Sequence, residues 1–140
     1  MYRKILVPLD FTKKNEAALT SAAEIAGRGE GSEIALLHVI ETIEHIDFEE
    51  MGDFYRGLET RAAAKLFASA EQLGKEGLRV RHEILYGKRA ETIVRYAEEQ
   101  GTDLLILSSH KVDPEHPALG WGTISYRVAI VARCPVLLVK

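Results

Sequence analysis

Short apolar runs, separated by segments with helical spacing, constrain the fold of this chain more than any other feature. They cover residues 5–7, 34–40, 104–107 and 136–139, and nearly every position in them is hydrophobic. A strand that helices cover on both faces needs apolar side chains on both faces, so it shows a continuous hydrophobic run in place of alternation. The runs therefore predict strands of a parallel sheet that lies between two layers of helices.

Helices are expected between these strands. Apolar residues recur at helical spacing over residues 18–26, 48–73, 90–97 and 124–132. Thr12 precedes the first of these segments and is a candidate N-cap. Glycines follow the first three segments, as is typical of helix ends.

Strands and helices alternate along the whole chain. A further run with strand character around residues 80–85 raises the expected number of strands to five. Parallel strands are joined by right-handed crossovers, which place helices on both faces of a sheet. The sequence therefore predicts an α/β fold with a doubly wound, mostly parallel five-stranded sheet and helices on both faces, in a single domain over residues 1–140.

Composition excludes several classes of partner. The net charge is −3, so the chain lacks the basic field that drives binding to nucleic acid. No apolar run approaches the ~20 residues that span a bilayer, so no membrane is expected. A single cysteine, Cys134, excludes an internal disulfide, and without a secretion signal we expect a cytoplasmic protein. A small buried hydrophobe is the expected role of Cys134.

Polar residues follow two of the predicted strands. Pro8 and Asp10 come after the first, and Ser108 begins a polar loop after the run at 104–107. Ligands of doubly wound sheets lie outside the carboxyl ends of the strands, where the strand order reverses. If the two strands are neighbours, we expect Asp10 and this loop to face each other across a crevice.

A helix start is expected to close the far side of that crevice. Gly122 and Thr123 precede the helical segment at 124–132. The first N–H groups of a helix have no intrahelical partners and form an anion site where glycine permits close approach. This arrangement favours a phosphorylated small molecule as the ligand.

Purely structural roles account for the same residues. Asp10 caps the first helix or orders its loop in that interpretation, Ser108 and Ser109 are turn residues, and Gly122 is an ordinary helix-start glycine. His38 lies inside an apolar strand, where a hydrogen-bonded core histidine is expected.

Two further segments carry clustered charge. A loop holds possible metal-binding side chains, but it lacks a rigid scaffold, so we expect no dedicated metal site. The side chains are His110, Asp113, Glu115 and His116. Residues 41–53 are strongly acidic, and we interpret them as a solvated connector or frayed helix start, with a partner-binding or lid element as the alternative.

Five segments in order resemble the universal stress protein A family, and the resemblance covers essentially the whole chain. They are Lys4-Ile5-Leu6-Val7-Pro8-Leu9-Asp10, Leu36-Leu37-His38-Val39, the strand that runs into Ser109-His110, Gly122-Thr123, and Arg133-Cys134-Pro135-Val136-Leu137-Leu138-Val139. The resemblance implies the adenine nucleotide alpha hydrolase-like, Rossmann-like variant of the predicted fold.

The phosphate loop departs from the pattern of the nucleotide-binding members. Ser108 and Lys111 stand where the family has its first two glycines, and the ten residues between Lys111 and Gly122 are one more than that pattern has. Lys111 places a long side chain in the loop, but it also brings a cation to a phosphate site. Part of the family carries a similar Ser-His-Arg-like loop and still handles nucleotides.

The resemblance implies three groups of contacts with an adenine nucleotide, which we expect to be ATP, ADP or AMP, with Mg²⁺ carried by the nucleotide. Pro8, Asp10 and Val39 would contact the adenosine. The pocket wall would comprise Leu107, Ser108, Ser109, His110 and Lys111, and the phosphate site Gly122, Thr123, Ile124 and Ser125.

The resemblance also implies a regulatory role. The predicted function is a dimeric stress-response or signalling module with an unidentified client protein. A slow ATPase or phosphotransfer enzyme and a nucleotide-free dimeric adaptor remain open alternatives. We expect the homodimer to form through the last strand, where an apolar edge must be paired or shielded. The interface residues would be Val136, Leu137, Leu138 and Val139.

Overall fold

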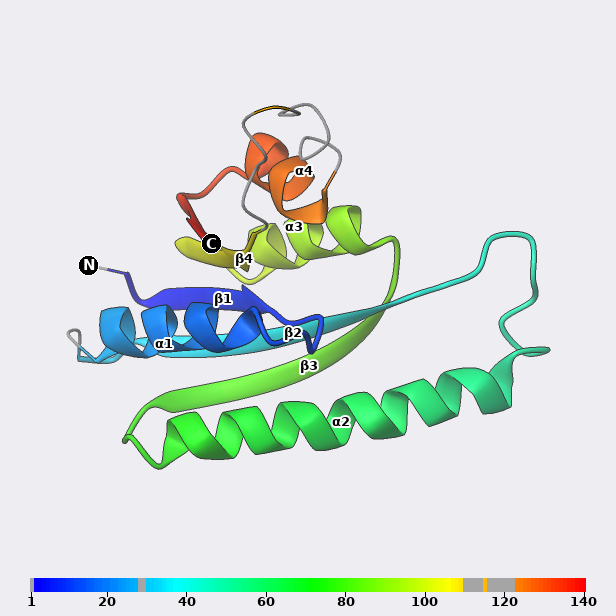
Figure 1. Ribbon diagram of the computed structural model, residues 1–140, viewed down its shortest axis with the longest axis horizontal. Coiled ribbons are helices and arrows are strands. Elements are labelled where there is room, and N and C mark those ends of the chain that lie inside the picture. Colours follow the sequence, from blue (N-terminus) through cyan, green and yellow to red (C-terminus); the bar gives the residue numbers. More distant parts are fainter. Residues whose placement is uncertain (1, 28–29, 110–114, 116–122) are drawn as a thin grey trace.

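Five parallel strands form one sheet in the order β3-β2-β1-β4-β5 (Figure 1). The computed structural model describes residues 2–27, 30–109, 115 and 123–140. The strands are β1 (Lys4–Pro8), β2 (Glu33–Glu41), β3 (Arg79–Gly87), β4 (Leu104–Ser108) and β5 (Val136–Val139). The helices are α1 (Asn15–Ala26), α2 (Gly52–Gly74), α3 (Arg89–Glu99) and α4 (Ile124–Val131). The predicted doubly wound α/β fold is confirmed.

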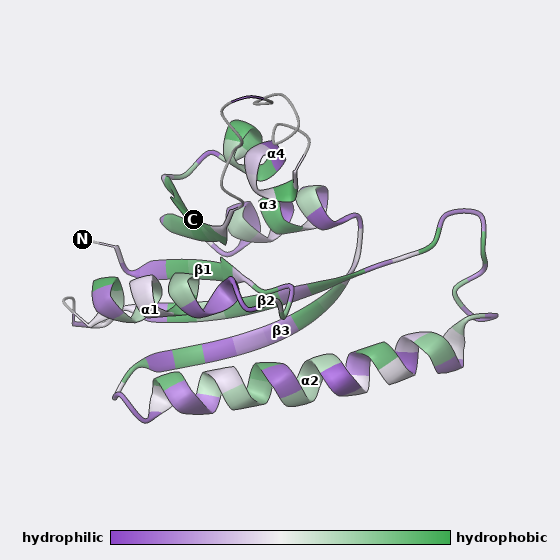
Figure 2. Ribbon diagram, viewed as in Figure 1, coloured by the Kyte–Doolittle hydropathy of each residue, from purple (hydrophilic) through white to green (hydrophobic). Residues whose placement is uncertain are grey.

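The two faces of the sheet are buried against different helices. Alternate side chains of a strand point to opposite faces, so Ile5 and Val7 pack with α1 and α2, whereas Leu6 packs with α3 and α4. Figure 2 shows the hydrophobic colouring of β1 between these layers. Full burial of the central strands explains why the sequence shows apolar runs without alternation.

The central strand β1 connects the two halves of the sheet. Ile5 pairs with Ile34 of β2 on one side and with Leu104 of β4 on the other. From β1 the chain first builds outward through β2 and β3, and then returns to add β4 and β5. The strand order therefore reverses between β1 and β4, and their carboxyl ends lie side by side, as the sequence analysis required for a crevice.

Two helix starts differ from the predictions. Thr12 is not the N-cap of α1, because the cap position is Lys14 and no side chain caps the helix. The hydroxyl of Thr12 instead donates to Asp10. Helix α2 begins at Gly52, so the helical spacing that started at Phe48 extends beyond the helix itself.

The connection from β2 to α2 projects beyond the rest of the molecule (Figure 1). Residues 41–50 are all exposed, and α2 begins after them at Gly52. At the opposite end of the sheet, Cys134 packs against the cluster beneath α3 and α4 and is half-buried. This burial raises the pKa of its thiol. No helix in the described ranges has the length and hydropathy needed to cross a membrane.

Substitutions at two neighbouring residues of α2 can test which side of this helix faces the core. Leu66 is fully buried, whereas the side chain of Phe67 is 61% exposed. We expect Leu66→Ala to lower the free energy of unfolding by about 2–5 kcal/mol, because it leaves a cavity in the core. Phe67→Ala should change it by less than about 0.5 kcal/mol. Urea unfolding followed by circular dichroism measures both, and equal losses would contradict this placement of α2.

Candidate functional site

The loop after β1 is shaped by the side chain of Asn15, the first residue of α1. Its Oδ1 accepts hydrogen bonds from the backbone N–H of Asp10 at 3.0 Å and of Phe11 at 2.9 Å. Phe11 has a φ of 65°, which is uncommon for a residue with a side chain. The two hydrogen bonds hold the chain in this conformation as it leaves the sheet.

The same side chain joins the ends of two strands. Nδ2 of Asn15 donates to Oγ of Ser108, at the end of β4, over 2.9 Å. Oγ of Ser108 in turn donates to the carbonyl of Lys14 at 3.3 Å. Because Asn15 is buried, these bonds form with little competition from water. The carboxyl ends of β1 and β4 are thereby held at a fixed spacing.

Asp10 orders the loop and presents its carboxylate at the crevice. Oδ1 accepts hydrogen bonds from the Thr12 hydroxyl at 2.7 Å and from the Thr12 N–H at 3.0 Å. Partial burial raises the pKa of Asp10, but these hydrogen bonds and the positive charge of Arg89 outweigh it and lower the pKa below its ordinary value. Asp10 is therefore an anion at neutral pH, and its loop-ordering role is confirmed.

Hydroxyl groups line the side of the crevice next to α4. Ser109 is fixed by its N–H, which donates to the carbonyl of Val139 at 2.8 Å. Oγ of Ser125 donates to Oγ of Ser109 at 3.4 Å and is hydrogen-bonded to Oγ1 of Thr123 at 3.3 Å. Thr123 has extended backbone, and α4 begins at the next residue. This places three hydroxyls beside a helix start.

These elements enclose a cavity of about 360 Å³. Nine residues that the sequence analysis selected line it: Pro8, Asp10, Val39, Leu107, Ser108, Ser109, Thr123, Ile124 and Ser125. His110, Lys111 and Gly122 lie outside the described residues, as do three members of the possible metal-binding loop, Asp113, His116 and His110. The structure therefore brings together every selected site residue that it describes. Their contact with a ligand remains a prediction.

Several cavity residues were missed from the sequence. They are Leu9, Thr12, Lys14, Asn15, Leu37, Arg89 and Ile93. Arg89 is the most informative of them, because its guanidinium makes no ion pair within 4 Å among the residues described and is half-buried. It is the first residue of α3, directly after Lys88, and also lines an adjoining depression together with Ile124. The sequence signal that could have identified Arg89 is a cation at the start of a helix that follows a parallel strand.

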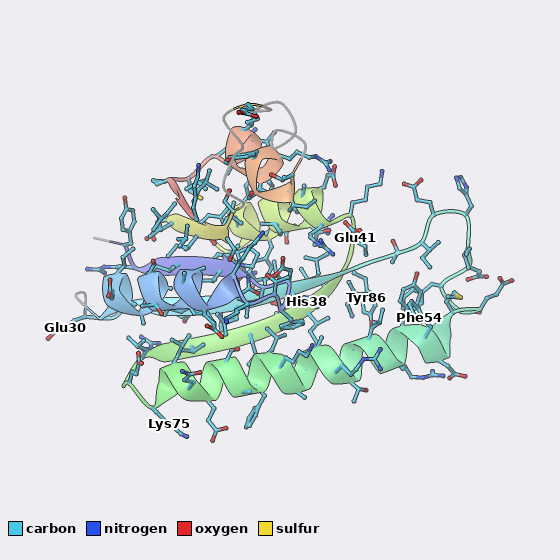
Figure 3. All side chains as sticks on the ribbon, in the orientation of Figure 1. Glu30, His38, Glu41, Phe54, Lys75 and Tyr86 are labelled. Carbon is cyan, nitrogen blue, oxygen red and sulfur yellow. The ribbon has the colours of Figure 1, made fainter. Side chains whose placement is uncertain are left out.

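His38 lies beneath the loop, as Figure 3 shows. Its Nδ1–H donates to the carbonyl of Leu9 over 2.7 Å, and its ring packs on Phe11 with centroids 4.3 Å apart. Burial lowers the pKa of His38 despite the hydrogen bond to Leu9, so the ring is neutral at pH 7. The expected hydrogen-bonded histidine is confirmed, although the side chain is half-buried and not fully enclosed.

The cavity combines three chemistries. Leu37, Val39, Ile93 and Leu107 form apolar walls, Asp10 supplies an anionic acceptor, and hydroxyls and Arg89 supply hydrogen-bond donors. Such a site suits a ligand with a flat apolar part, polar edges and an anionic group.

Comparison with known proteins gives consistent matches over the full length. The family model described as the universal stress protein family matches residues 1–140. Universal stress protein MJ0577 of Methanocaldococcus jannaschii is 30% identical over an alignment of 158 residues, which covers 100% of this chain and 96% of the relative. A solved structure of MJ0577 superposes with a TM-score of 0.85 at 32% identity and covers 100% of this chain and 96% of its own.

More distant structures share the fold. Universal stress protein UspA from Lactobacillus plantarum has a TM-score of 0.84 at 24% identity, with 99% of this chain and 98% of that chain covered. A universal stress protein from Archaeoglobus fulgidus, solved in complex with dAMP, has a TM-score of 0.72 at 20% identity, with coverage of 99% and 98%. A universal stress protein solved in complex with cAMP has a TM-score of 0.75 at 17% identity, with 99% of this chain and 97% of that chain covered.

The Asn15 connection can be measured as a coupling energy. Asn15→Ala removes the acceptor for two backbone N–H groups and the donor to Ser108, so we expect it to lower the free energy of unfolding by about 2 kcal/mol or more. Ser108→Ala removes one hydrogen bond and should lower it by about 1 kcal/mol. The double variant should lose less than the sum of the two. Strict additivity in urea unfolding would contradict a direct bond between these side chains.

Proposed function

This chain belongs to the universal stress protein family, and we propose that it binds an adenine nucleotide, ATP foremost, in the cavity between β1 and β4. The cavity at the reversal of the strand order is the observation that carries this proposal. It combines apolar walls, the Asp10 anion and a helix start with hydroxyls in one space of about 360 Å³. Doubly wound folds bind nucleotides at this position.

The adenosine part fits the end of the cavity beside β1 and β2. Val39 and Leu37 give an apolar surface for the base, and the Asp10 carboxylate accepts hydrogen bonds from ligand N–H or O–H groups. The family relatives solved with dAMP and cAMP support an adenine ligand for this fold. Pro8 completes this end of the site.

The phosphates fit beside the start of α4. Thr123 and Ser125 line the cavity with their hydroxyls, and the first N–H groups of a helix form an anion site. Arg89 borders the cavity with Ile124, on the side of α4. We infer that its guanidinium supplies positive charge to a site whose loop has Ser108 and Lys111 in place of two glycines. Mg²⁺ would arrive with the nucleotide.

Regulation is the biological role that we favour for this binding. In a stress response, binding of the nucleotide would change the affinity of a cytoplasmic dimer for a client protein. A slow ATPase would use the same cavity, and release of phosphate from ATP above background would distinguish it from a protein that only binds the nucleotide. A nucleotide-free adaptor is distinguished by the absence of binding.

Arg89 provides the test of nucleotide binding. Isothermal titration with ATP, ADP, AMP and adenosine, with and without Mg²⁺, should give saturable binding of ATP to the wild-type protein. We expect Arg89→Ala to raise the Kd for ATP about tenfold and to leave that for adenosine nearly unchanged, because only ATP presents charge to the guanidinium. Arg95→Ala, on the same helix but outside the cavity, should leave both unchanged.

Two results would contradict parts of this proposal. No binding of ATP at millimolar concentration with Mg²⁺ would exclude the nucleotide site. Equal weakening of ATP and adenosine binding by Arg89→Ala would show that the side chain shapes the cavity and does not contact phosphate.

A homodimer through β5 is the second part of the proposal. Among the residues that the structure describes, this edge strand pairs with β4 alone, and we infer that its outer backbone groups can pair with a second strand. Leu137 is exposed at this edge. Two copies that pair antiparallel about a two-fold axis would satisfy these groups and cover Val136, Leu137, Leu138 and Val139 to different extents.

Light scattering tests the dimer. The carbonyls of Pro135 and Val139 accept hydrogen bonds from β4, so the alternate residues Val136 and Leu138 turn their backbone groups outward. The wild-type protein should have twice the mass of the chain at tens of micromolar, and Leu138→Pro should be monomeric because proline removes a donor from the outer side of the strand. Circular dichroism checks that the variant is folded. A monomeric wild-type protein would exclude the dimer, and a dimer that tolerates the proline would place the interface elsewhere.

A further inference from the structure

Exposed apolar side chains gather on the projecting segment between β2 and α2, far from the edge strand β5. Of the eight large apolar side chains that stand exposed in the described part of the chain, four lie within residues 43–54. We call them the arm surface: Ile43, Ile46, Phe48 and Phe54. Both phenylalanine side chains are 48% exposed.

The arm surface rests on an ordered aromatic cluster. Phe48 stacks on the buried Tyr55 with ring centroids 4.9 Å apart and meets Tyr86 edge-on at 5.2 Å. Phe54 also contacts Tyr55, in a T-shaped arrangement with ring centroids 5.5 Å apart. Figure 3 shows Phe54 and Tyr86 near the arm, between α2 and the end of β2–β3. The hydroxyl of Tyr55 accepts a hydrogen bond from the N–H of Ile43 at 2.9 Å, which fixes the connector to the helix.

Carboxylates surround this apolar patch. Residues 41–55 contain six acidic side chains and no lysine or arginine. Glu44 pairs with Lys88 at 3.4 Å and Asp53 pairs with Arg56. The other four acidic side chains form no ion pair with any residue that the structure describes: Glu41, Asp47, Glu49 and Glu50. Phe48, Glu49 and Glu50 also border a depression of about 330 Å³.

Helix stability explains only part of this pattern. Carboxylates near the N-terminus of α2 interact favourably with the helix dipole, which accounts for Asp53 and contributes for Glu50. It does not account for Glu41 or Asp47, which precede the helix by several residues. It also does not account for the exposed part of the two phenylalanines: their rings contact Tyr55, but each residue remains 48% exposed, and apolar surface in water is unfavourable.

We propose that the arm surface binds a basic amphipathic helix of a partner protein. Apolar side chains of such a helix would cover Phe48 and Phe54, while its lysines or arginines would meet the uncompensated carboxylates. Aromatic anchors with a charged rim are typical of interfaces in which an amphipathic helix lies in a groove. The complementary charge favours this occupant over a second copy of the chain, because two copies would bring two acidic rims together.

A defined probe tests this surface without knowledge of the natural partner. The probe is a fluorescein-labelled peptide of about 18 residues, or five helical turns, with leucines at helical spacing on one face and lysines on the other. Fluorescence anisotropy with the full-length protein should show saturable binding at tens of micromolar. Binding should weaken at least about tenfold between roughly 0.05 and 0.5 M NaCl, because screening reduces the attraction of exposed charges.

Matched variants separate the apolar and electrostatic contributions. Phe48→Ala/Phe54→Ala should raise the Kd about tenfold or more, whereas Phe67→Ala, an exposed phenylalanine elsewhere on α2, should not change it. Glu49→Gln/Glu50→Gln should raise the Kd about fivefold. Glu71→Gln/Glu76→Gln removes the same charge at the opposite end of α2 and should have little effect.

Control peptides and the oligomeric state complete the test. A peptide of the same composition with scrambled leucines should bind at least about tenfold more weakly. Absence of binding, or equal binding by Phe48→Ala/Phe54→Ala and wild type with both folded by circular dichroism, would overturn the proposal. It would also be overturned if Phe48→Ala/Phe54→Ala converted a dimer into a monomer, since a second copy would then cover the arm surface.

Discussion

The geometry of the candidate site depends on one side-chain amide. Asn15 accepts from two backbone N–H groups of the β1–α1 loop and donates to Ser108 at the end of β4. Without it the N–H groups of Asp10 and Phe11 would lose their partner in the protein, and the positive φ at Phe11 would no longer be stabilised by these hydrogen bonds. The cavity, the placement of the Asp10 carboxylate and the spacing of the two strands all follow from this residue.

The fold was predictable because buried strands and helices leave a pattern of hydrophobic residues within short stretches of sequence. Leu6 and Leu105 are fully buried in strands that helices cover on both faces, and such strands show as apolar runs. The site was predictable where chemistry coincides with a strand end, as at Asp10 and Ser108. Asn15 was not selected, because its bond to Ser108 joins segments distant in sequence, and Arg89 was not selected although it is a cation at the start of α3. Thr12 was assigned wrongly, because its hydroxyl orders the loop through Asp10 and does not cap α1.

Two regions of different character share strand β2. Val39 contributes to the cavity wall, and the strand ends at Glu41, where the acidic connector begins. The cavity combines apolar walls with the Asp10 anion and the Arg89 cation, as small-molecule sites combine apolar surface with a few polar groups. The arm surface combines exposed apolar side chains with a rim of carboxylates, as protein interfaces do. The cavity and the arm surface are thus both connected to β2.

The position of β1 at the middle of the sheet has a consequence for synthesis of the chain on the ribosome. Its partner β2 follows within about thirty residues, but β4 begins at Leu104, and the N–H of Arg3 bonds to a side chain 100 residues away. As the polypeptide emerges from its N-terminus, one side of this central strand stays unpaired until more than two thirds of the chain has been made. Chaperones that shield nascent hydrophobic segments would meet this protein at that edge.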